Sequence, residues 1–148
     1  MLFMQTCYNG CVIHTIDVSL GLLTYNDKVL LMLRDNRLHI SGANKWCFVG
    51  GGKEQGESFE QAVLREIKES TGLHLLSVTL LTTITDTVGK NYVYHATLTT
   101  DNLNNIKRGE GQDLNFFTLP EVEKLSLATA TKIFFSNNKD TLQKILHN

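Results

Sequence analysis

The segment from Gly51 to Leu73, GGKEQGESFEQAVLREIKESTGL, constrains this chain more than any other. It passes from a glycine cluster into a stretch with a clear helical beginning and end. Ser58 is a good N-cap residue and Gly72 is a good C-terminal stop, so the spacing predicts a helix between them. This helix carries Glu66 and Glu69 near its C-terminal end. The segment therefore predicts both a local fold and a pair of carboxylates held at a fixed spacing.

The predicted helix has an apolar stripe formed by Phe59, Val63 and Ile67. Glu66 falls on the same side as this stripe, and Glu69 lies beside it, one helical turn further on. Charged residues are rarely placed at the edge of a core-facing surface unless they are paired or bound to a cation. Mg²⁺ takes oxygen ligands and often bridges carboxylates to substrate phosphates. The two glutamates are therefore candidate metal ligands, with a salt-bridged surface helix as the alternative interpretation.

The same segment resembles the box motif of Nudix hydrolases, G-x5-E-x7-R-E-U-x-E-E-x-G-U, in which U is a bulky aliphatic residue. Most positions of the motif are matched, namely by Gly51, Glu57, Arg65, Glu66, Ile67, Glu69, Gly72 and Leu73. The motif fixes many residue types at fixed spacing, so a chance match is improbable. One position departs, because Ser70 stands where the family has the second glutamate of its pair.

The resemblance extends beyond the box on both sides. The residues 46–51, WCFVGG, are similar to the W-x-L/F-P-G-G approach of the family, with Val49 in place of proline. The residues 109–112, GEGQ, are similar to the E-G-Q segment of MutT-like members, whose glutamate reaches the metal site. Most of the chain is therefore covered by the resemblance.

The resemblance implies a fold and an activity. The expected fold is α/β, a Nudix-type α/β/α sandwich with a mixed β-sheet, formed by residues 1–148 as a single domain. The expected activity is Mg²⁺-dependent or Mn²⁺-dependent hydrolysis of a nucleoside diphosphate linked to another moiety, with a tilt toward MutT-like nucleoside triphosphate pyrophosphatases. The alternatives are an ADP-ribose or nucleotide-sugar pyrophosphatase, and a nucleotide-binding module of the same fold with weakened catalysis.

The resemblance also assigns roles to individual residues. The expected catalytic residues are Glu66, Glu69, Arg65 and Glu57, and the expected metal ligands are Glu66, Glu69, Glu110 and Gly50. The glycines Gly50, Gly51 and Gly52 would let the backbone turn tightly and bring its carbonyls near the cofactor. Arg65 and Glu57 are expected to form a structural pair, with direct contact of Arg65 to a substrate phosphate as the alternative.

Ser70 weakens the expectation of full activity. A hydroxyl is a neutral and weaker ligand than a carboxylate, so the site loses one negative charge and should bind Mg²⁺ more weakly or hold fewer ions. Catalysis then either persists through Glu66, Glu69 and Glu110 or is lost. Val49 is a milder change, because it removes a rigid turn residue but no chemical group.

Composition limits which other classes of protein this chain could belong to. A formal net charge of −1 over 148 residues gives no general electrostatic case for binding nucleic acid or a membrane. The cysteines Cys7, Cys11 and Cys47 lack the paired spacing of a zinc site and are interpreted as reduced thiols. The N-terminus lacks early basic residues and is a poor signal peptide, and no apolar run is long enough to span a bilayer. We expect a cytoplasmic protein with a small-molecule nucleotide substrate, and leave a homodimer open.

The remaining pattern predicts alternating strands and helices. Strands or extended segments are expected at 12–16, 19–23, 28–33, 46–49, 75–87, 92–99 and 114–118, with turns at Asn26–Asp27 and Gly89–Lys90. Loops are expected at 34–45 and 102–111, and helices at 125–135 and 140–146, with Pro120 in the first turn of a further helix.

Several aromatic and basic residues have two possible roles. Trp46 either packs beneath the glycine cluster or stacks on a base, and packing is favoured. The strand aromatics Tyr92, Tyr94, Phe116 and Phe117 either line a base pocket or form core, and core is favoured. Arg34 and Arg37 flank the expected substrate side, where they either meet phosphates or belong to a solvated loop, and the solvated loop is favoured. Among the histidines only His39, in the polar loop, is a candidate.

Overall fold

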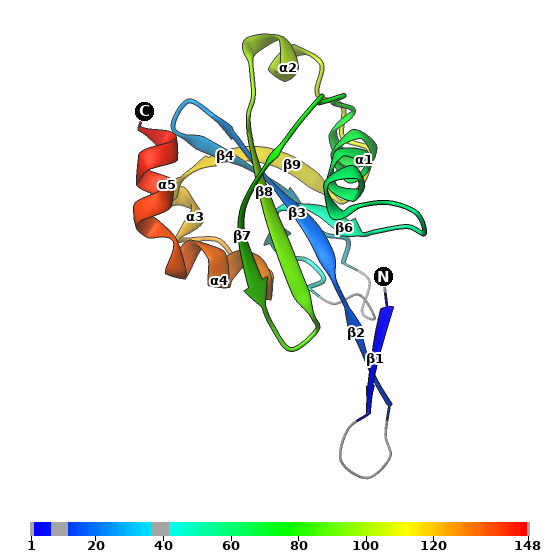
Figure 1. The fold of residues 1–148 in the computed structure, drawn as a ribbon. Coiled ribbons are helices and arrows are strands. Elements are labelled where there is room, and N and C mark those ends of the chain that lie inside the picture. The colour runs from blue at the N-terminus through cyan, green and yellow to red at the C-terminus, as the bar shows by residue number, and fades with distance from the viewer. Residues whose placement is uncertain (1, 7–11, 37–41, 148) are drawn as a thin grey trace.

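The computed structural model describes residues 2–6, 12–36 and 42–147, and a mixed seven-stranded sheet forms its centre (Figure 1). The strands run in the order β5-β4-β3-β8-β7, while β6 also pairs with β3 and β9 with β4. Strands β3 and β8 are parallel and the other pairs are antiparallel. The strand bounds are β3 Val18–Tyr25, β4 Lys28–Leu33, β5 Trp46–Cys47, β6 Val49–Gly52, β7 Thr79–Thr85, β8 Lys90–Thr97 and β9 Asp113–Thr118.

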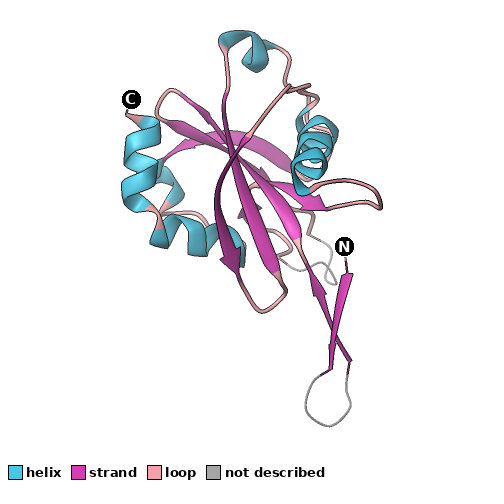
Figure 2. Ribbon diagram, viewed as in Figure 1, coloured by secondary structure: helices cyan, strands magenta, loops and turns pink. Residues whose placement is uncertain are grey.

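Helices cover the sheet from both sides, as the coloured elements of Figure 2 show. One side is covered by α1, and the other by α4 and α5 (Figure 1). The short helices α2 and α3 lie in connections. The helix bounds are α1 Phe59–Thr71, α2 Thr100–Asn104, α3 Leu119–Val122, α4 Thr129–Asn137 and α5 Lys139–Leu146. The expected α/β/α sandwich with a mixed sheet is therefore confirmed.

Two apolar clusters hold these layers together, one on each face of the sheet. The strands contribute to both clusters, because successive side chains of a strand point to opposite faces. Neighbouring residues such as Leu22 and Leu23 are both fully buried but belong to different clusters. This follows from the two-residue period of a strand, which sends successive side chains to opposite faces. Central strands covered on both faces therefore appear as continuous apolar runs in the sequence.

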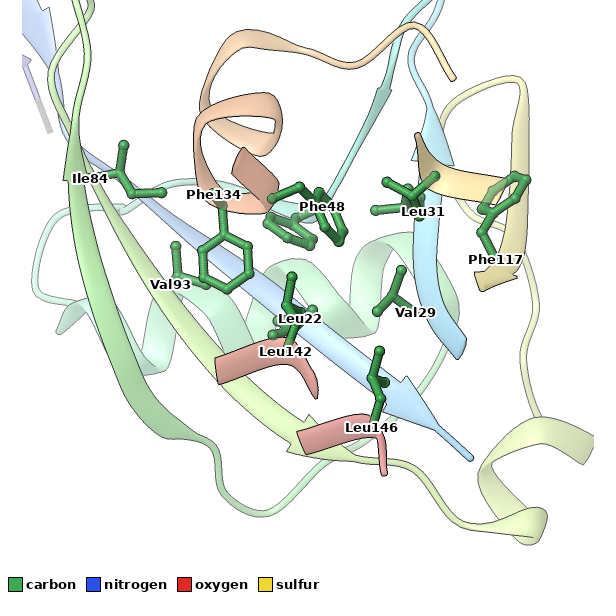
Figure 3. Close-up of a cluster of buried hydrophobic side chains, with 12 residues drawn as sticks. Leu22, Val29, Leu31, Phe48, Ile84, Val93, Phe117, Phe134, Leu142 and Leu146 are labelled. Atoms are coloured by element: carbon green, nitrogen blue, oxygen red, sulfur yellow. The ribbon is translucent and has the colours of Figure 1, made fainter. Parts of the chain in front are cut away.

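The cluster beneath α4 and α5 is rich in aromatic rings (Figure 3). Phe48 contacts Phe134 edge to face, with ring centroids 5.3 Å apart, and lies tilted against Phe135 at 5.4 Å. Leu142 from α5 is also buried among these side chains. Burial of large apolar groups, together with favourable ring geometry, fixes this pair of helices on the sheet.

A two-stranded antiparallel ribbon of β1 (Leu2–Thr6) and β2 (Val12–Ile16) extends away from the body (Figure 1). The expected strand at 12–16 is confirmed, whereas β1 was not anticipated. The turn at Asn26–Asp27 joins β3 to β4, and Gly89 lies in the connection between β7 and β8. Both expected hairpins are therefore confirmed, with β7 shorter than expected. Within the described residues, no helix is long and apolar enough to cross a membrane.

Three expectations about local structure were wrong. Residues 100–104 form helix α2 rather than the beginning of a loop, because Thr99 and Asn102 form a reciprocal capping box. The helix expected from 125 begins only at Thr129, because the segment before it bonds to a strand: Trp46 N–H donates to Ser126 O at 2.9 Å. The glycines 50–52 form strand β6, paired with β3, and the turn comes after them.

Candidate metal centre

Helix α1 begins and ends where the sequence predicts. Ser58 accepts a hydrogen bond from Gln61 N–H at 3.1 Å, and the Gln61 side chain accepts one from Ser58 N–H at 2.8 Å. Gly72 ends the helix in the left-handed conformation, with φ of 76°. Val63 and Ile67 are fully buried against the sheet. Because these two residues fix the rotation of the helix about its axis, they also fix the directions in which the Glu66 and Glu69 side chains leave it.

Three carboxylates meet at the C-terminal half of this helix. One ligand oxygen each from Glu66, Glu69 and Glu110 lies within 4.8 Å of the others. Glu66 and Glu69 come from successive turns of α1, and Glu110 comes from the loop before β9. The Glu66 side chain is 14% exposed and the Glu69 side chain 45% exposed. The structure therefore brings together the three acidic residues predicted as metal ligands.

Backbone bonds hold the Glu110 loop against the end of α1. Lys107 N–H donates to Thr71 O at 2.8 Å, and Gly109 N–H donates to Ser70 O at 2.9 Å. A side chain at Gly109 would collide with the carbonyl of Glu69. Glycine is therefore required at this position, because only a residue without Cβ allows the loop to approach the helix so closely.

Ser70 is fully buried and its hydroxyl faces the loop. Its Oγ donates a hydrogen bond to Glu110 Oε2, with 3.3 Å between the two atoms. The residue that departs from the family motif thus contacts one of the three carboxylates. A hydroxyl at this place restrains Glu110 without adding a negative charge.

Arg65 connects the helix to the loop that precedes it. Its Nε and Nη2 atoms donate to the two carboxylate oxygens of Glu57 at 2.8 and 3.1 Å, in a bidentate pair. Nη2 also donates to Gly52 O at 3.0 Å, and Nη1 donates to Glu66 and Glu69 at 3.1 and 3.2 Å. Every nitrogen of the guanidinium is engaged, which is the arrangement expected of the structural pair.

The pKa values of Glu66 and Glu57, two carboxyl groups bonded to Arg65, are shifted in opposite directions. Burial raises the pKa of the Glu66 carboxyl, and the charges of Glu69 and Glu110 add to the rise, while Arg65 opposes it. The hydrogen bond from Arg65 lowers the pKa of Glu57, with help from the backbone N–H of Glu54. Glu66 is therefore the carboxylate whose charge is least well solvated at the site.

Gly51 lies directly beside the Glu66 carboxylate. A Cβ at Gly51 would stand 2.6 Å from Glu66 Oε1, and one at Gly50 would collide with the backbone of β3. These glycines were expected to allow a tight turn. Their role in the structure is instead to allow close packing. Gly51 packs on the Glu66 side chain, and Gly50 packs on the backbone of β3.

A cavity of about 610 Å³ opens beside the carboxylates. Its lining includes Glu66, Glu110, Gly50 and Gly51, together with Met32 of β4 and Arg34, which follows the end of that strand. This volume lies in the range of small-molecule sites, about 300–1,000 Å³. Two of the three acidic residues predicted as metal ligands, Glu66 and Glu110, therefore border a space large enough for a nucleotide-sized molecule.

Arg34, which lines the cavity, does not lie in a solvated loop as expected. It was interpreted as part of a solvated loop, but its Nε atom is buried and has no hydrogen-bond partner among the described residues. A signal was available, because Arg34 is the first polar residue after the buried strand β4. Neighbouring Cys47 is buried, and that burial raises the pKa of its thiol to about 11, so Cys47 remains a neutral thiol.

Gln112 of the GEGQ segment has a structural position. Its side-chain N–H donates to Arg34 O at 2.7 Å and to Asn44 Oδ1 at 3.1 Å. Its backbone N–H donates to Leu33 O at 2.8 Å. The loop is thus tied to the end of β4 on one side and to α1 on the other, with Glu110 between the two attachments.

The aromatic residues considered for base binding lie mostly in the core. Trp46 packs edge to face on Phe117 with centroids 4.8 Å apart, which confirms packing but not a position beneath the glycines. Tyr94 is buried, and Tyr92 stacks on Phe59 at 4.2 Å. The remaining candidates, Cys7, Cys11, Arg37 and His39, lie outside the described residues.

The donor set fits a hard divalent cation. Carboxylate oxygens are the ligands preferred by Mg²⁺ and Mn²⁺. Three carboxylates converge here, and among the described residues the ion pairs to Glu66 and Glu69 come from one guanidinium, that of Arg65, which is itself paired with Glu57. Burial raises the pKa of Glu66, and the nearby charges of Glu69 and Glu110 add to the rise, so a divalent ion would favour the ionised form of this carboxyl.

Comparison with known proteins agrees with this geometry. The family model of the NUDIX domain matches residues 15–137. A curated relative, the ADP-ribose pyrophosphatase of Methanocaldococcus jannaschii, is 46% identical over 55 residues, a match that covers 36% of this chain and 30% of the relative. The match thus spans less than a third of that protein's length.

Solved structures share the fold. A mutT/nudix family protein from Listeria innocua superposes with a TM-score of 0.71 at 20% identity, covering 90% of this chain and 98% of that one. The NUDIX domain of Shewanella oneidensis NrtR, determined in complex with ADP ribose, superposes with a TM-score of 0.69 at 22% identity, covering 86% and 88%. At these identities the similarity establishes the architecture alone.

Proposed function

This chain belongs to the Nudix family, and on that basis we propose that it hydrolyses a nucleoside diphosphate linked to another group, using a divalent metal ion. The observation that carries the proposal is the convergence of Glu66, Glu69 and Glu110 beside a cavity of about 610 Å³. Nudix hydrolases generally use a divalent metal. The acidic cluster of this chain has the chemistry needed to hold one.

We assign the binding of the ion to Glu66, Glu69 and Glu110, with the backbone of Gly50 beside them. A bound divalent ion supplies charge neutralisation of the diphosphate and lowers the pKa of a bound water. The chain's own part is to hold these oxygens in place and to keep the cavity open. Arg65 and Glu57 do so by fixing the loop before α1 on the helix that carries the carboxylates.

We assign removal of the water proton to Glu66. Glu66 is the least exposed of the three carboxylates and borders the cavity in which the water and the diphosphate would meet. The water oxygen bonds to one phosphorus, the bridging P–O bond breaks, and the proton passes to Glu66. Arg34, on the cavity wall, is suitably placed to meet the anionic substrate.

Two substrate classes follow from two different observations. The GEGQ segment, which brings Glu110 to the cluster, favours a MutT-like nucleoside triphosphate pyrophosphatase. The identity to an ADP-ribose pyrophosphatase over 55 residues favours ADP-ribose or a related sugar nucleotide. We propose the triphosphate class first and the ADP-ribose class second.

Ser70 leaves room for a nucleotide-binding module of low activity, and its hydrogen bond to Glu110 argues against that alternative. The hydroxyl holds a remaining ligand in place, so the site is organised rather than degraded. Replacing Ser70→Glu separates the two cases. A large rise in turnover would favour the weakened module, whereas unchanged or lower turnover supports a site adapted to serine.

The decisive experiment measures phosphate release from a panel of nucleotides, coupled to a phosphatase, with Mg²⁺ or Mn²⁺. The panel contains dNTPs, 8-oxo-dGTP, ADP-ribose, nucleotide sugars and dinucleotide polyphosphates. We expect metal-dependent turnover of at least one class and a loss of about 100-fold or more in Glu66→Gln. Lys68→Gln, on the exposed side of the same helix, is the matched control. If no compound is hydrolysed although nucleotides still bind, the chain is a nucleotide-binding module rather than a hydrolase.

A further inference from the structure

A second cavity lies on the opposite side of the sheet, among α3, α4 and α5. Its volume is about 720 Å³, which is larger than that of the cavity at the carboxylates. The apolar part of its lining comes from α3, α4, α5 and the segment between α3 and α4, and includes Leu119, Val122, Leu125, Leu127, Phe135 and Leu142. A space of this size and character suits a small molecule with an apolar body.

Three lysines also line the cavity, one from each of three segments. Lys45 precedes β5, Lys132 lies in α4, and Lys139 begins α5. All three are exposed, and none forms an ion pair with a carboxylate of the described residues. Glu123 is the single acidic residue of the lining. The cavity therefore carries two more cationic than anionic groups, a balance that favours an anionic ligand.

The two cavities are independent of one another. They share no lining residue, and the layers that form them cover opposite faces of the sheet (Figure 1). The first is bordered by the glutamates of the metal site, and the second by unpaired lysines. A ligand of the second cavity is therefore distinct from the substrate bound at the carboxylates.

We propose that this cavity binds an amphipathic anion, a molecule with an apolar alkyl or aryl body and a phosphate or carboxylate head. The leucines, Val122 and Phe135 receive the body, because removing apolar surface from water is favourable in proportion to its area. The lysines receive the head as point charges, a role in which lysine commonly serves phosphate groups. Both halves of the ligand are needed, since neither the apolar lining nor the exposed charges suffice alone.

The test is a calorimetric titration of the full chain with octyl phosphate and with octanoate, which share a tail length and differ in the head. Inorganic phosphate and 1-octanol are the matched half-ligands. We expect at least one amphiphile to bind at least tenfold more tightly than either half-ligand. The tighter of the two identifies the preferred head. If neither amphiphile binds, or if inorganic phosphate or 1-octanol binds as tightly, the proposal is overturned.

Variants then locate the site. Lys132→Glu combined with Lys139→Glu should weaken amphiphile binding at least tenfold. Lys124→Glu combined with Lys144→Glu makes the same change in net charge outside the cavity, and should alter binding less than twofold. Thermal unfolding of both variants checks that each is folded. Equal losses in the two variants would show a general charge effect and reject the site, as would full binding by the first variant.

Discussion

The two sides of the sheet attach their helices in different ways. On the α4–α5 side, contact is made by interlocking aromatic and aliphatic side chains such as Phe48 and Phe134. On the α1 side, buried aliphatic residues lie under the helix, but its edge carries Arg65 bonded to several acidic partners.

This difference separates two tasks of the fold. Apolar contact is strong but non-directional, so it holds a helix on a sheet without fixing any one polar atom. Hydrogen bonds and ion pairs are directional, so the network around Arg65 positions the carboxylates relative to the loop of Glu110. Both sides are therefore packed by apolar residues, and the α1 side also places the atoms that chemistry requires.

The largest expected effect tests the packing side. Phe134→Ala removes a fully buried ring between Phe48 and Phe135, and should lower the free energy of unfolding by about 3–5 kcal/mol. Urea unfolding followed by circular dichroism measures it. Lys132→Ala, an exposed change in the same helix, should remain within about 0.5 kcal/mol of the wild type. A loss below about 1 kcal/mol for Phe134→Ala would contradict the assignment of stability to this cluster.

The next effect tests the directional side. Arg65→Ala leaves Glu57, Glu66 and the Gly52 carbonyl without their donor, and should cost about 2–4 kcal/mol of unfolding free energy. Added Mg²⁺ should restore part of this stability, because the ion replaces some of the lost positive charge. Lys68→Ala in the same helix is the control and should change little. An Arg65→Ala protein as stable as the wild type would show that the network has no structural role.

A smaller effect concerns Ser70. Ser70→Ala removes the hydrogen bond to Glu110, which should weaken Mn²⁺ binding about fivefold, equivalent to about 1 kcal/mol. Isothermal titration with Mn²⁺ measures the affinity. Ser19→Ala is the matched control, because Ser19 is also fully buried and donates to a carbonyl, that of Phe59, at 2.7 Å. If the two variants bind Mn²⁺ with the same affinity, the Ser70 hydroxyl does not contribute to the metal site.

The smallest effect is a pH dependence. The pKa of Glu57 is lowered in the folded state, so its ion pair stabilises the protein above the ordinary glutamate value of 4.5 and loses this contribution as the pH falls below it. Glu66 has the opposite sign, because its raised pKa makes ionisation costly as the pH rises. The stability difference between wild type and Glu57→Gln, below about 1 kcal/mol at pH 7, should shrink between pH 4.5 and pH 3. A difference that grows on acidification would reverse this assignment.

Sequence patterns predicted the local features well, because those depend on neighbours in the chain. The caps at Ser58 and Gly72, the apolar stripe of α1 and the two hairpin turns all follow from short-range rules. Errors arose where a distant partner intervened. Residues 125–128 resemble a helix, yet Ser126 lies beside Trp46 and bonds to its backbone N–H.

By itself, the sequence determined the family motif, the mixed α/β architecture and the acidic residues that form the candidate site. Only the tertiary structure placed Glu110 against α1, put the Ser70 hydroxyl on that carboxylate, and made Arg34 part of the cavity wall. The physical reason is separation along the chain. A helix cap or an apolar stripe depends on residues a few positions apart, whereas Ser70 and Glu110 are separated by 40 positions. Their contact exists because buried strands and directional backbone bonds bring those two segments together.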